Sequence, residues 1–260
     1  MLVERGREIL QSVDSLVEDL RLLSGEPRGP VSVGFPPSLS ILLSVPLLET
    51  IHNEHKDIRL HICEAMSGDI LDWLANDRID VGCVYEISDS TPYSFEPLLT
   101  EEIFLVTAPD NWDDDFGPDG VAKNAIPAAR LQELPLVLTS PTHGARKLQE
   151  KFARAGGFNL NVVAAIDSLP HIVEMVSRAS AYSLLAHGAV LKEVAAGTLG
   201  LVRIEEPTIR RTAYMVRKRA RPVSRASAIV ESTICTIIRE LIDRYDIQTT
   251  LPQKTTAVQA

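Results

Sequence analysis

Short apolar runs alternate with longer stretches of helical periodicity in the first part of the chain. Residues 31–35, 58–64 and 81–85 read VSVGF, IRLHICE and VGCVY, which is typical of buried strands. Between them, the segments that run to about residue 51 and over residues 70–80 repeat apolar residues at helical spacing. The order strand, helix, strand, helix, strand predicts an open α/β sheet.

The same alternation returns after the polar run 86–92, which predicts a second set of elements and a domain boundary near Leu98. Strands are expected at 103–106, 134–140, 162–166, 182–186, 201–204 and 212–216, and helices at 142–157, 168–177, 188–196 and 224–244. Residues 111–120 are expected to form a surface loop, and the tail 248–260 to be disordered because it has no apolar face.

The N-terminal 29 residues are expected to form a helix and a hinge. Apolar side chains recur there at spacings of 4, 3, 4 and 3, at Ile9, Val13, Leu16, Leu20 and Leu23. Two interpretations stay open for this seam: an amphipathic helix packed on its own domain, or a dimerising coiled coil with a second chain.

Composition narrows the class of protein. The chain has 260 residues, 45% of them hydrophobic, and a formal net charge of -9, so it can bury a full core but makes a poor stand-alone DNA binder. The basic stretch 203–225 is interpreted as the solvated flank of a strand. Three scattered cysteines indicate reduced core residues, and neither a signal peptide nor a membrane span is evident, so a cytoplasmic location is expected.

Hydroxyl residues stand where four predicted strands lead into helices: Ser38, Ser67, Thr142 and Ser168. We expect them to be N-caps. Because helix N-termini at the carboxyl edge of a sheet present free N–H groups and a positive dipole end, the four junctions predict a site for a small anion.

The residues beside these hydroxyls complete the candidate effector-binding set. Pro37, Gly68 and Gly144 adjoin three of the junctions. Arg146 is interpreted either as a partner for the anion or as an exposed helix residue, and His143 either as a pocket residue or as a bystander.

No marked catalytic motif is found. Walker-type, GxGxxG, GxSxG and HExxH patterns are absent from the sequence. His52 and His55 lack a third ligand at suitable spacing. We therefore expect no enzyme activity, no catalytic residue, no metal and no cofactor.

The sequence resembles the linker helix and effector-binding domain of LysR-type transcriptional regulators. Residues 29–34 (GPVSVG) resemble the family's G-x-L-R-I-G, residues 45–48 (VPLL) its L-P-x-L-L helix, and residues 80–82 (DVG) its L-D-x-A-I strand. Residues 97–106 resemble P-L-x-x-E-x-L-x-L-V, and residues 144–146 the G-x-R helix start. Residues 2–7 resemble the L-T-x-x-G segment of the linker helix, and the wording near residues 36–38 and 140–144 is similar to the nitrogen assimilation control branch.

This resemblance implies two Rossmann-like lobes of the type 2 periplasmic-binding-protein architecture, preceded by a linker helix. Lobe I would comprise residues 30–98 plus 210–247 and lobe II residues 99–209, with an effector between them. It also implies a homodimer or homotetramer that controls transcription through ligand-dependent changes in oligomer geometry, with DNA bound by a winged helix-turn-helix outside this sequence.

One departure from the family pattern bears on local geometry. The family's V-A-A-G-x-G-x-x-L-L-P run reads VSRASAYSLLA at residues 176–186, without either glycine. A left-handed backbone there would cost a residue other than glycine energy. The alternative function is a solute-binding protein of the same two-lobed fold, cytosolic or exported, with no role in transcription.

Overall fold

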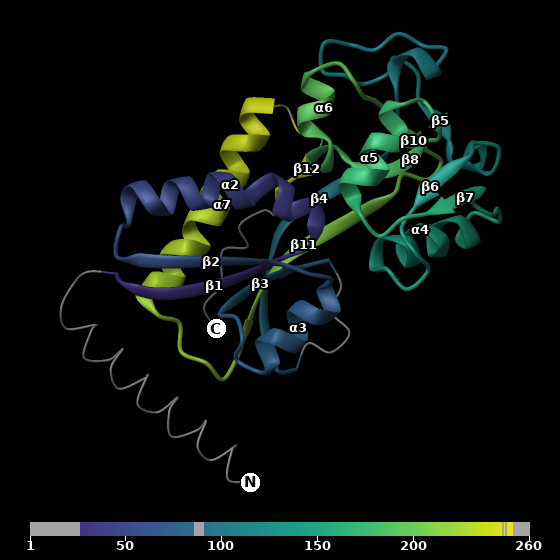
Figure 1. Cartoon of the computed structure of the whole chain (residues 1–260). Coiled ribbons are helices and arrows are strands. Elements are labelled where there is room, and N and C mark those ends of the chain that lie inside the picture. Colours follow the sequence, from purple (N-terminus) through teal and green to yellow (C-terminus); the bar gives the residue numbers. More distant parts are fainter. Residues whose placement is uncertain (1–26, 86–90, 246, 248, 252–260) are drawn as a thin grey trace, which may run out of the picture.

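Two lobes joined by a pair of long strands make up the described chain (Figure 1). The structure is a computed structural model that describes residues 27–85, 91–245, 247 and 249–251. Strands β4 (Tyr93–Thr107) and β11 (Arg210–Lys218) pair antiparallel and run between the lobes. This arrangement confirms the predicted two-lobed α/β fold.

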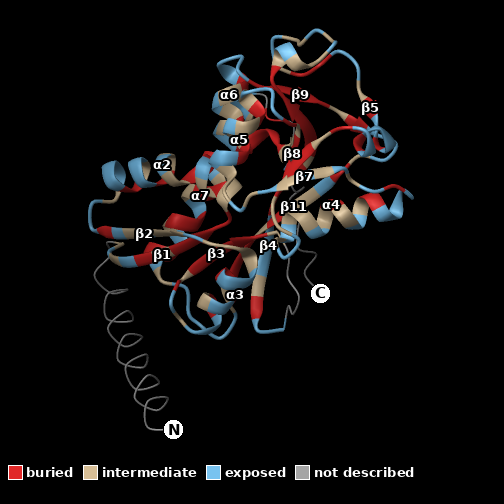
Figure 2. Cartoon of the chain, turned by 45° about the vertical axis from the view of Figure 1, so that its right-hand side comes forward, coloured by how far each residue is buried: buried red, intermediate tan, exposed pale blue. Residues whose placement is uncertain are grey.

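Lobe I is a mixed sheet with helices on both faces. Strand order across the sheet is β12-β4-β11-β3-β1-β2, where β12 is Thr249–Thr250, and β1 pairs parallel with β2 and with β3. Helices α2 and α7 share one core with β1, and α3 shares a second core with β3 (Figure 2). Its elements are β1 (Gly29–Phe35), α2 (Pro37–Glu54), β2 (Ile58–Glu64), α3 (Ser67–Ala75), β3 (Val81–Val84) and α7 (Arg225–Tyr245).

Glycine lets α3 lie close to the sheet. A Cβ atom on Gly82 of β3 would come within 2.5 Å of Ile70 Cγ2 and 3.1 Å of Leu74 Cδ1 on α3. Because no side chain stands there, the helix packs directly on the strand, and its N-terminus stays at the carboxyl end of β2.

Lobe II holds the second set of elements. Strands β8 and β9 pair antiparallel with the far half of β4, while β6 pairs parallel with β7. Its elements are η1 (Pro109–Asn111), β5 (Ile126–Pro127), η2 (Ala128–Gln132), β6 (Leu136–Leu138), α4 (Gly144–Ala155), β7 (Val162–Ala165), α5 (Leu169–Ser177), β8 (Ser183–Ala186), η3 (His187–Ala189), α6 (Leu191–Ala195), β9 (Gly200–Val202) and β10 (Ile204–Glu205).

Three expectations need correction or lie outside the described residues. The strand expected at 103–106 begins at Tyr93, because β4 pairs with β11 along its whole first half. The tail is not wholly disordered, since β12 (Thr249–Thr250) pairs with β4 at Thr100 and Glu101. The linker helix with its seam, and residues 252–260, lie outside the described residues.

The boundaries of the lobes remain our proposal. Leu98 and Leu99 of β4 belong to the core of lobe I, whereas Ile103 and Leu105 belong to a core of lobe II. The helix expected over 188–196 is divided into η3 and α6.

Ala179 occupies the position where the family glycines are absent. Its φ of 56° lies in the left-handed region. The Ala179 N–H donates to Val176 O over 2.9 Å and the Ser180 N–H to Met175 O over 3.2 Å, the pattern of a Schellman motif that ends α5. The turn is therefore kept, with an alanine where glycine fits better.

We expect Ala179→Gly to raise the free energy of unfolding by about 1 kcal/mol, because it removes the penalty of a left-handed non-glycine residue. Ser180→Gly, one residue further and outside the left-handed region, is the control and should be neutral or slightly destabilising. Urea denaturation measures both. A lower free energy of unfolding in Ala179→Gly would contradict the interpretation that the backbone of Ala179 is strained.

Candidate functional site

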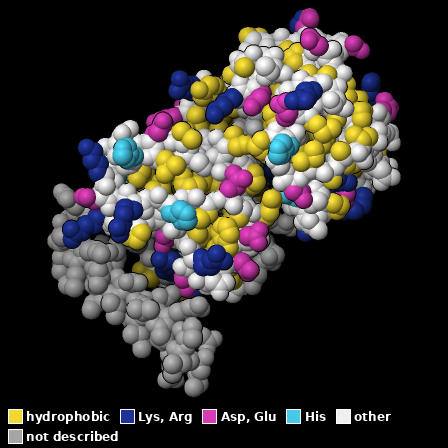
Figure 3. All heavy atoms as spheres, viewed as in Figure 1, with side chains coloured by type: hydrophobic (Ala, Val, Ile, Leu, Met, Phe, Trp, Pro, Cys, Tyr) yellow, Lys and Arg dark blue, Asp and Glu magenta, His cyan; other side chains and the backbone are white. Residues whose placement is uncertain are grey.

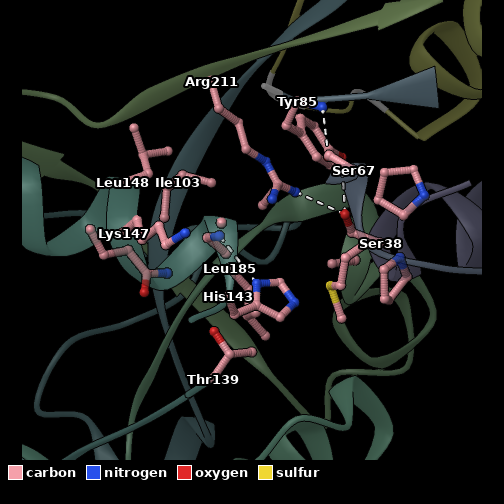
Figure 4. A pocket seen from close by; sticks show the side chains of 18 of the residues that line it. Ser38, Ser67, Tyr85, Ile103, Thr139, His143, Lys147, Leu148, Leu185 and Arg211 are labelled. Carbon is pink, nitrogen blue, oxygen red and sulfur yellow. Dashed lines mark hydrogen bonds between the residues drawn. The ribbon is translucent and has the colours of Figure 1, made fainter. Parts of the chain in front are cut away.

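A cavity of about 670 Å³ lies between the lobes (Figure 4). Lobe I lines it with the starts of α2 and α3 and with Tyr85, and lobe II with β8, α4 and the end of β6. Strand β11 adds Arg210, Arg211, Thr212 and Tyr214. The cavity therefore touches both lobes and one of the strands that join them.

Seven of the nine predicted effector-binding residues line this cavity: Pro37, Ser38, Ser67, Gly68, Thr142, His143 and Gly144. Arg146 and Ser168 are not among its lining residues. The Arg146 Nε donates to Glu150 Oε1 over 2.8 Å and its Nη1 donates to Thr139 O over 3.3 Å. Arg146 therefore ties α4 to the end of β6 instead of facing the cavity.

The prediction that the four hydroxyl residues are N-caps is wrong for Ser38, Ser67 and Thr142. Helices α2, α3 and α4 take as N-caps Pro36, Met66 and His143. Ser168 is the N-cap of α5, but its side chain makes no capping hydrogen bond.

The hydroxyls bind other groups instead. Ser38 Oγ lies 2.9 Å from the Tyr85 hydroxyl, and Ser67 Oγ accepts the Tyr85 N–H over 3.2 Å. Thr142 Oγ1 lies 3.1 Å from Ser140 Oγ. Ser38 and Ser67 thus hold Tyr85 against the starts of α2 and α3, where no side-chain cap occupies the first-turn N–H groups.

His143 caps α4 with its ring. The Ala145 N–H donates to His143 Nδ1 over 3.1 Å. Burial lowers the pKa of His143 and Arg211 acts in the same direction, while Asp167 opposes them. The neutral imidazole is favoured, which keeps Nδ1 available as an acceptor, since protonation would remove it.

A buried ion pair borders the cavity where β4 and β11 cross between the lobes. Arg211 stands opposite Glu101 in the register of these strands, and its Nε donates to Glu101 Oε2 over 2.9 Å. Their side chains are 12% and 4% exposed. Arg211 Nη2 also donates to Ser38 Oγ over 3.0 Å, and the guanidinium lies 3.8 Å from the centre of the Tyr85 ring.

The charge states follow from this packing. Burial acts to lower the pKa of Arg211, but Glu101 and Tyr85 raise it overall, so the guanidinium stays charged. Burial also raises the pKa of Tyr85, whose hydroxyl therefore stays neutral. The bonds to Glu101 and Ser38 leave further N–H donors on the guanidinium at the cavity wall.

The interpretation of the basic stretch as a solvated flank is wrong for Arg211 and incomplete for its neighbours. Lys218 pairs with Asp77 at 2.6 Å, and Arg217 lies 3.6 Å from both Glu96 and Glu231. Arg210 is 67% exposed and lies 4.0 Å from Glu102. Each of these cations has a carboxylate of an adjoining element within 4.0 Å.

Cationic side chains outnumber carboxylates in the lining of the cavity, although Arg211 and Arg210 are also paired with Glu101 and Glu102 outside the lining. Four cationic side chains line it, Lys147, Lys151, Arg210 and Arg211, against two carboxylates, Asp69 and Asp167. None of these four cations belongs to the predicted effector-binding set. Charged residues within the strand-forming segments 93–107 and 210–218 were a usable signal for Glu101 and Arg211, but their pairing depends on a register that the sequence does not reveal.

Other kinds of site find little support in the part of the chain that the structure describes. Its His, Cys, Asp and Glu residues form no group of three that could hold a metal ion. Its helices include none with the length and apolar character needed to cross a membrane. Cys63, Cys83 and Cys235 are free thiols, and none lines the cavity.

Comparison with known proteins assigns the chain to a family. The model of the LysR substrate binding domain matches residues 24–232, so the chain belongs to this family. It is 27% identical over 209 residues to a probable hydrogen peroxide-inducible genes activator of Streptomyces viridosporus. The aligned residues make up 79% of this chain and 64% of that relative's length. It is also 19% identical over 250 residues to the nitrogen assimilation regulatory protein nac of Klebsiella aerogenes, and this alignment covers 95% of this chain and 79% of that protein.

Solved structures confirm the predicted two-lobed architecture. The OxyR C206 mutant of Corynebacterium glutamicum superposes with a TM-score of 0.74 at 19% identity, covering 94% of this chain and 75% of that one. The regulatory domain of CcmR from Synechocystis PCC6803, in complex with 2-PG, superposes with a TM-score of 0.69 at 16% identity. This superposition covers 81% of this chain and 97% of that one. The chain is thus a LysR-type regulatory domain, and its curated relatives are transcriptional regulators.

We expect Glu101→Gln to lower the free energy of unfolding by about 3 kcal/mol, because it leaves the buried charge of Arg211 without its counter-ion. Glu102→Gln is the matched control on the same strand. Its partner Arg210 is exposed and 4.0 Å away, so the loss should stay below about 1 kcal/mol. Equal losses in urea denaturation would contradict the role given to the buried pair.

Proposed function

We propose that this chain is the effector-sensing part of a LysR-type transcriptional regulator, and that the effector is a small anion held in the cavity between the lobes. The cavity itself is the main support for this proposal, because both lobes and Arg211 of the joining strand β11 line it. A ligand in that place is linked directly to the arrangement of the lobes.

The lining favours an anion. The starts of α2, α3 and α4 converge on the cavity, and helix N-termini attract negative charge through unpaired N–H groups and the helix dipole. Arg211 adds a buried, permanently charged guanidinium at the same wall. This positive region belongs to a chain with a net charge of -9, so it is a local feature and not the result of overall composition.

A signal follows from differential affinity. The lobes are joined by β4 and β11, and α2 of lobe I also contacts η3 of lobe II. An anion that binds groups of both lobes stabilises the arrangement in which those groups converge. The altered arrangement would change contacts between chains, and with them the position of DNA-binding domains in the intact regulator.

Family membership supports a regulator over the alternative of a solute-binding protein, since the curated relatives named above are regulators. A regulator of this class acts on DNA, which agrees with the expected cytoplasmic location.

Thiol-based sensing of peroxide, which the name of one relative suggests, finds no support at this cavity. Burial raises the pKa of Cys83 and of Cys235, so both thiols stay protonated. Peroxide reacts with exposed thiolates of low pKa. A small anion bound without covalent chemistry suits the lining better.

The charge variant Gly68→Asp tests the site. A Cβ atom on Gly68 meets nothing within 4 Å, and an aspartate in the first turn of α3 suits the helix dipole, so the fold should hold. Its carboxylate would face the cavity and repel an anion, and we expect affinity to fall about tenfold or more, as a repulsion of about 1.4 kcal/mol or more requires.

Gly68→Asn is the neutral control of nearly the same shape. Calorimetric titration of the anion found by a thermal-shift screen measures both variants. Equal affinity of Gly68→Asp and Gly68→Asn would place the anion away from α3 and contradict the proposed site.

We propose further that the chain forms a homodimer or homotetramer through an apolar patch on α2. Ile41, Val45 and Leu48 are 40%, 59% and 42% exposed at helical spacing, and hydrophobic side chains gather over α2 in Figure 3. Such a patch on a folded surface is typical of a contact between proteins.

We expect Val45→Glu to lower the order of assembly, from tetramer to dimer or from dimer to monomer, because it buries a charge in the apolar contact. Val163→Glu on β7 is the control, since Val163 is 56% exposed and lies outside the α2 patch. Sedimentation velocity measures the masses. An unchanged mass for Val45→Glu would exclude α2 from the contact.

A further inference from the structure

Helix α4 carries two lysines that face the cavity without a counter-ion. Lys147 and Lys151 both line it. They are four residues apart, so they lie on one face of the helix. Among the described residues, neither lysine takes part in an ion pair, whereas Arg146 and Arg154 on the same helix both pair with Glu150.

The two lysines form a second positive region, separate from the first. The first consists of Arg211 and the starts of α2, α3 and α4. The rise of 1.5 Å per residue places Lys147 about 5 Å, and Lys151 about 10 Å, along the helix axis from Gly144. In Figure 4, Lys147 lies on the side of the cavity opposite Ser38 and Ser67.

The carboxylates of the cavity do not cancel this region. Asp69 belongs to the first turn of α3 on the other lobe. Asp167 accepts the Ser140 N–H over 2.8 Å, and this hydrogen bond lowers the pKa of Asp167. Neither aspartate forms an ion pair with Lys147 or Lys151 in the described part of the chain. The lysines therefore remain available to a ligand.

We propose that the effector carries two separated anionic groups, one held by Arg211 and the helix N-termini and the other by Lys147 and Lys151. This inference rests on the proposed function and adds the chemical class of the effector. Counted along α4 from Gly144, the lysines suit a second anionic group roughly 5–10 Å from one held at the start of the helix, as in a dicarboxylate with a chain of several carbons. The second group binds lobe II alone, so it contributes affinity and selectivity, while the first group contacts both lobes.

The probes are straight-chain dicarboxylates of four to seven carbons and the monocarboxylates of equal length, titrated calorimetrically into the full chain. We expect the best dicarboxylate to bind the unmodified chain at least tenfold more tightly than its monocarboxylate. In Lys147→Gln/Lys151→Gln this preference should fall to about twofold or less, because dicarboxylate affinity falls several-fold more than monocarboxylate affinity.

Arg154→Gln is the matched control, because Arg154 is an exposed cation of α4 outside the cavity lining, and it should keep the preference. Equal binding of the two series to the unmodified chain would overturn the second subsite and leave the proposed function standing. An equal loss of affinity for dicarboxylates and monocarboxylates in the double variant would show a single anionic site and overturn the second subsite. Binding of neither series would contradict both the inference and the proposed function.

Discussion

The buried ion pair of Glu101 and Arg211 is the interaction on which the site depends. Both residues belong to the strands that join the lobes, and they stand opposite each other in the register of these strands. Arg211 also donates to Ser38 Oγ of lobe I. On the other side, Glu101 packs close to Gly188 of lobe II, since a Cβ atom added to this glycine would lie 3.6 Å from Glu101 Oε1. The junction of the lobes and the cationic anchor of the cavity are therefore the same pair of side chains.

This arrangement links ligand chemistry to lobe geometry. An isolated buried arginine would be costly, but Glu101, Ser38 and Tyr85 hold the guanidinium in one orientation with its charge retained. An anion that bound its remaining donors would compete with Glu101 for the guanidinium, so the proposed effector would act on the junction itself. Strand β12 pairs with β4 at Thr100 and Glu101, which brings the C-terminal segment to the same place.

The sequence predicted the order of the elements well, because alternation and helical spacing report burial directly, as in VSVGF before α2 and VGCVY after α3. It also predicted which junctions meet, since seven of nine expected residues line the cavity. It failed on capping, because Ser38 and Ser67 bind Tyr85, a partner that only the packing of three strands brings near.

The cations were missed for reasons of geometry. Arg146 matched the family motif, but one residue along a helix is a turn of about 100°, and it is Lys147 that faces the cavity. Arg211 looked like part of a solvated basic run, and only the register of β4 and β11 shows it to be buried. Ala179 shows the opposite case, because the left-handed turn survives without its glycine, held by the Schellman hydrogen bonds.

The most direct test of the account is a pair of crystal structures of this chain, with and without a saturating concentration of an anion whose binding has been measured in solution. We expect the anion between the lobes, within hydrogen-bonding distance of Arg211 and the start of α4, together with a changed angle between the lobes. An anion bound outside the cavity, or bound inside it with identical lobe arrangements, would contradict the proposal that anion binding sets the geometry of the lobes.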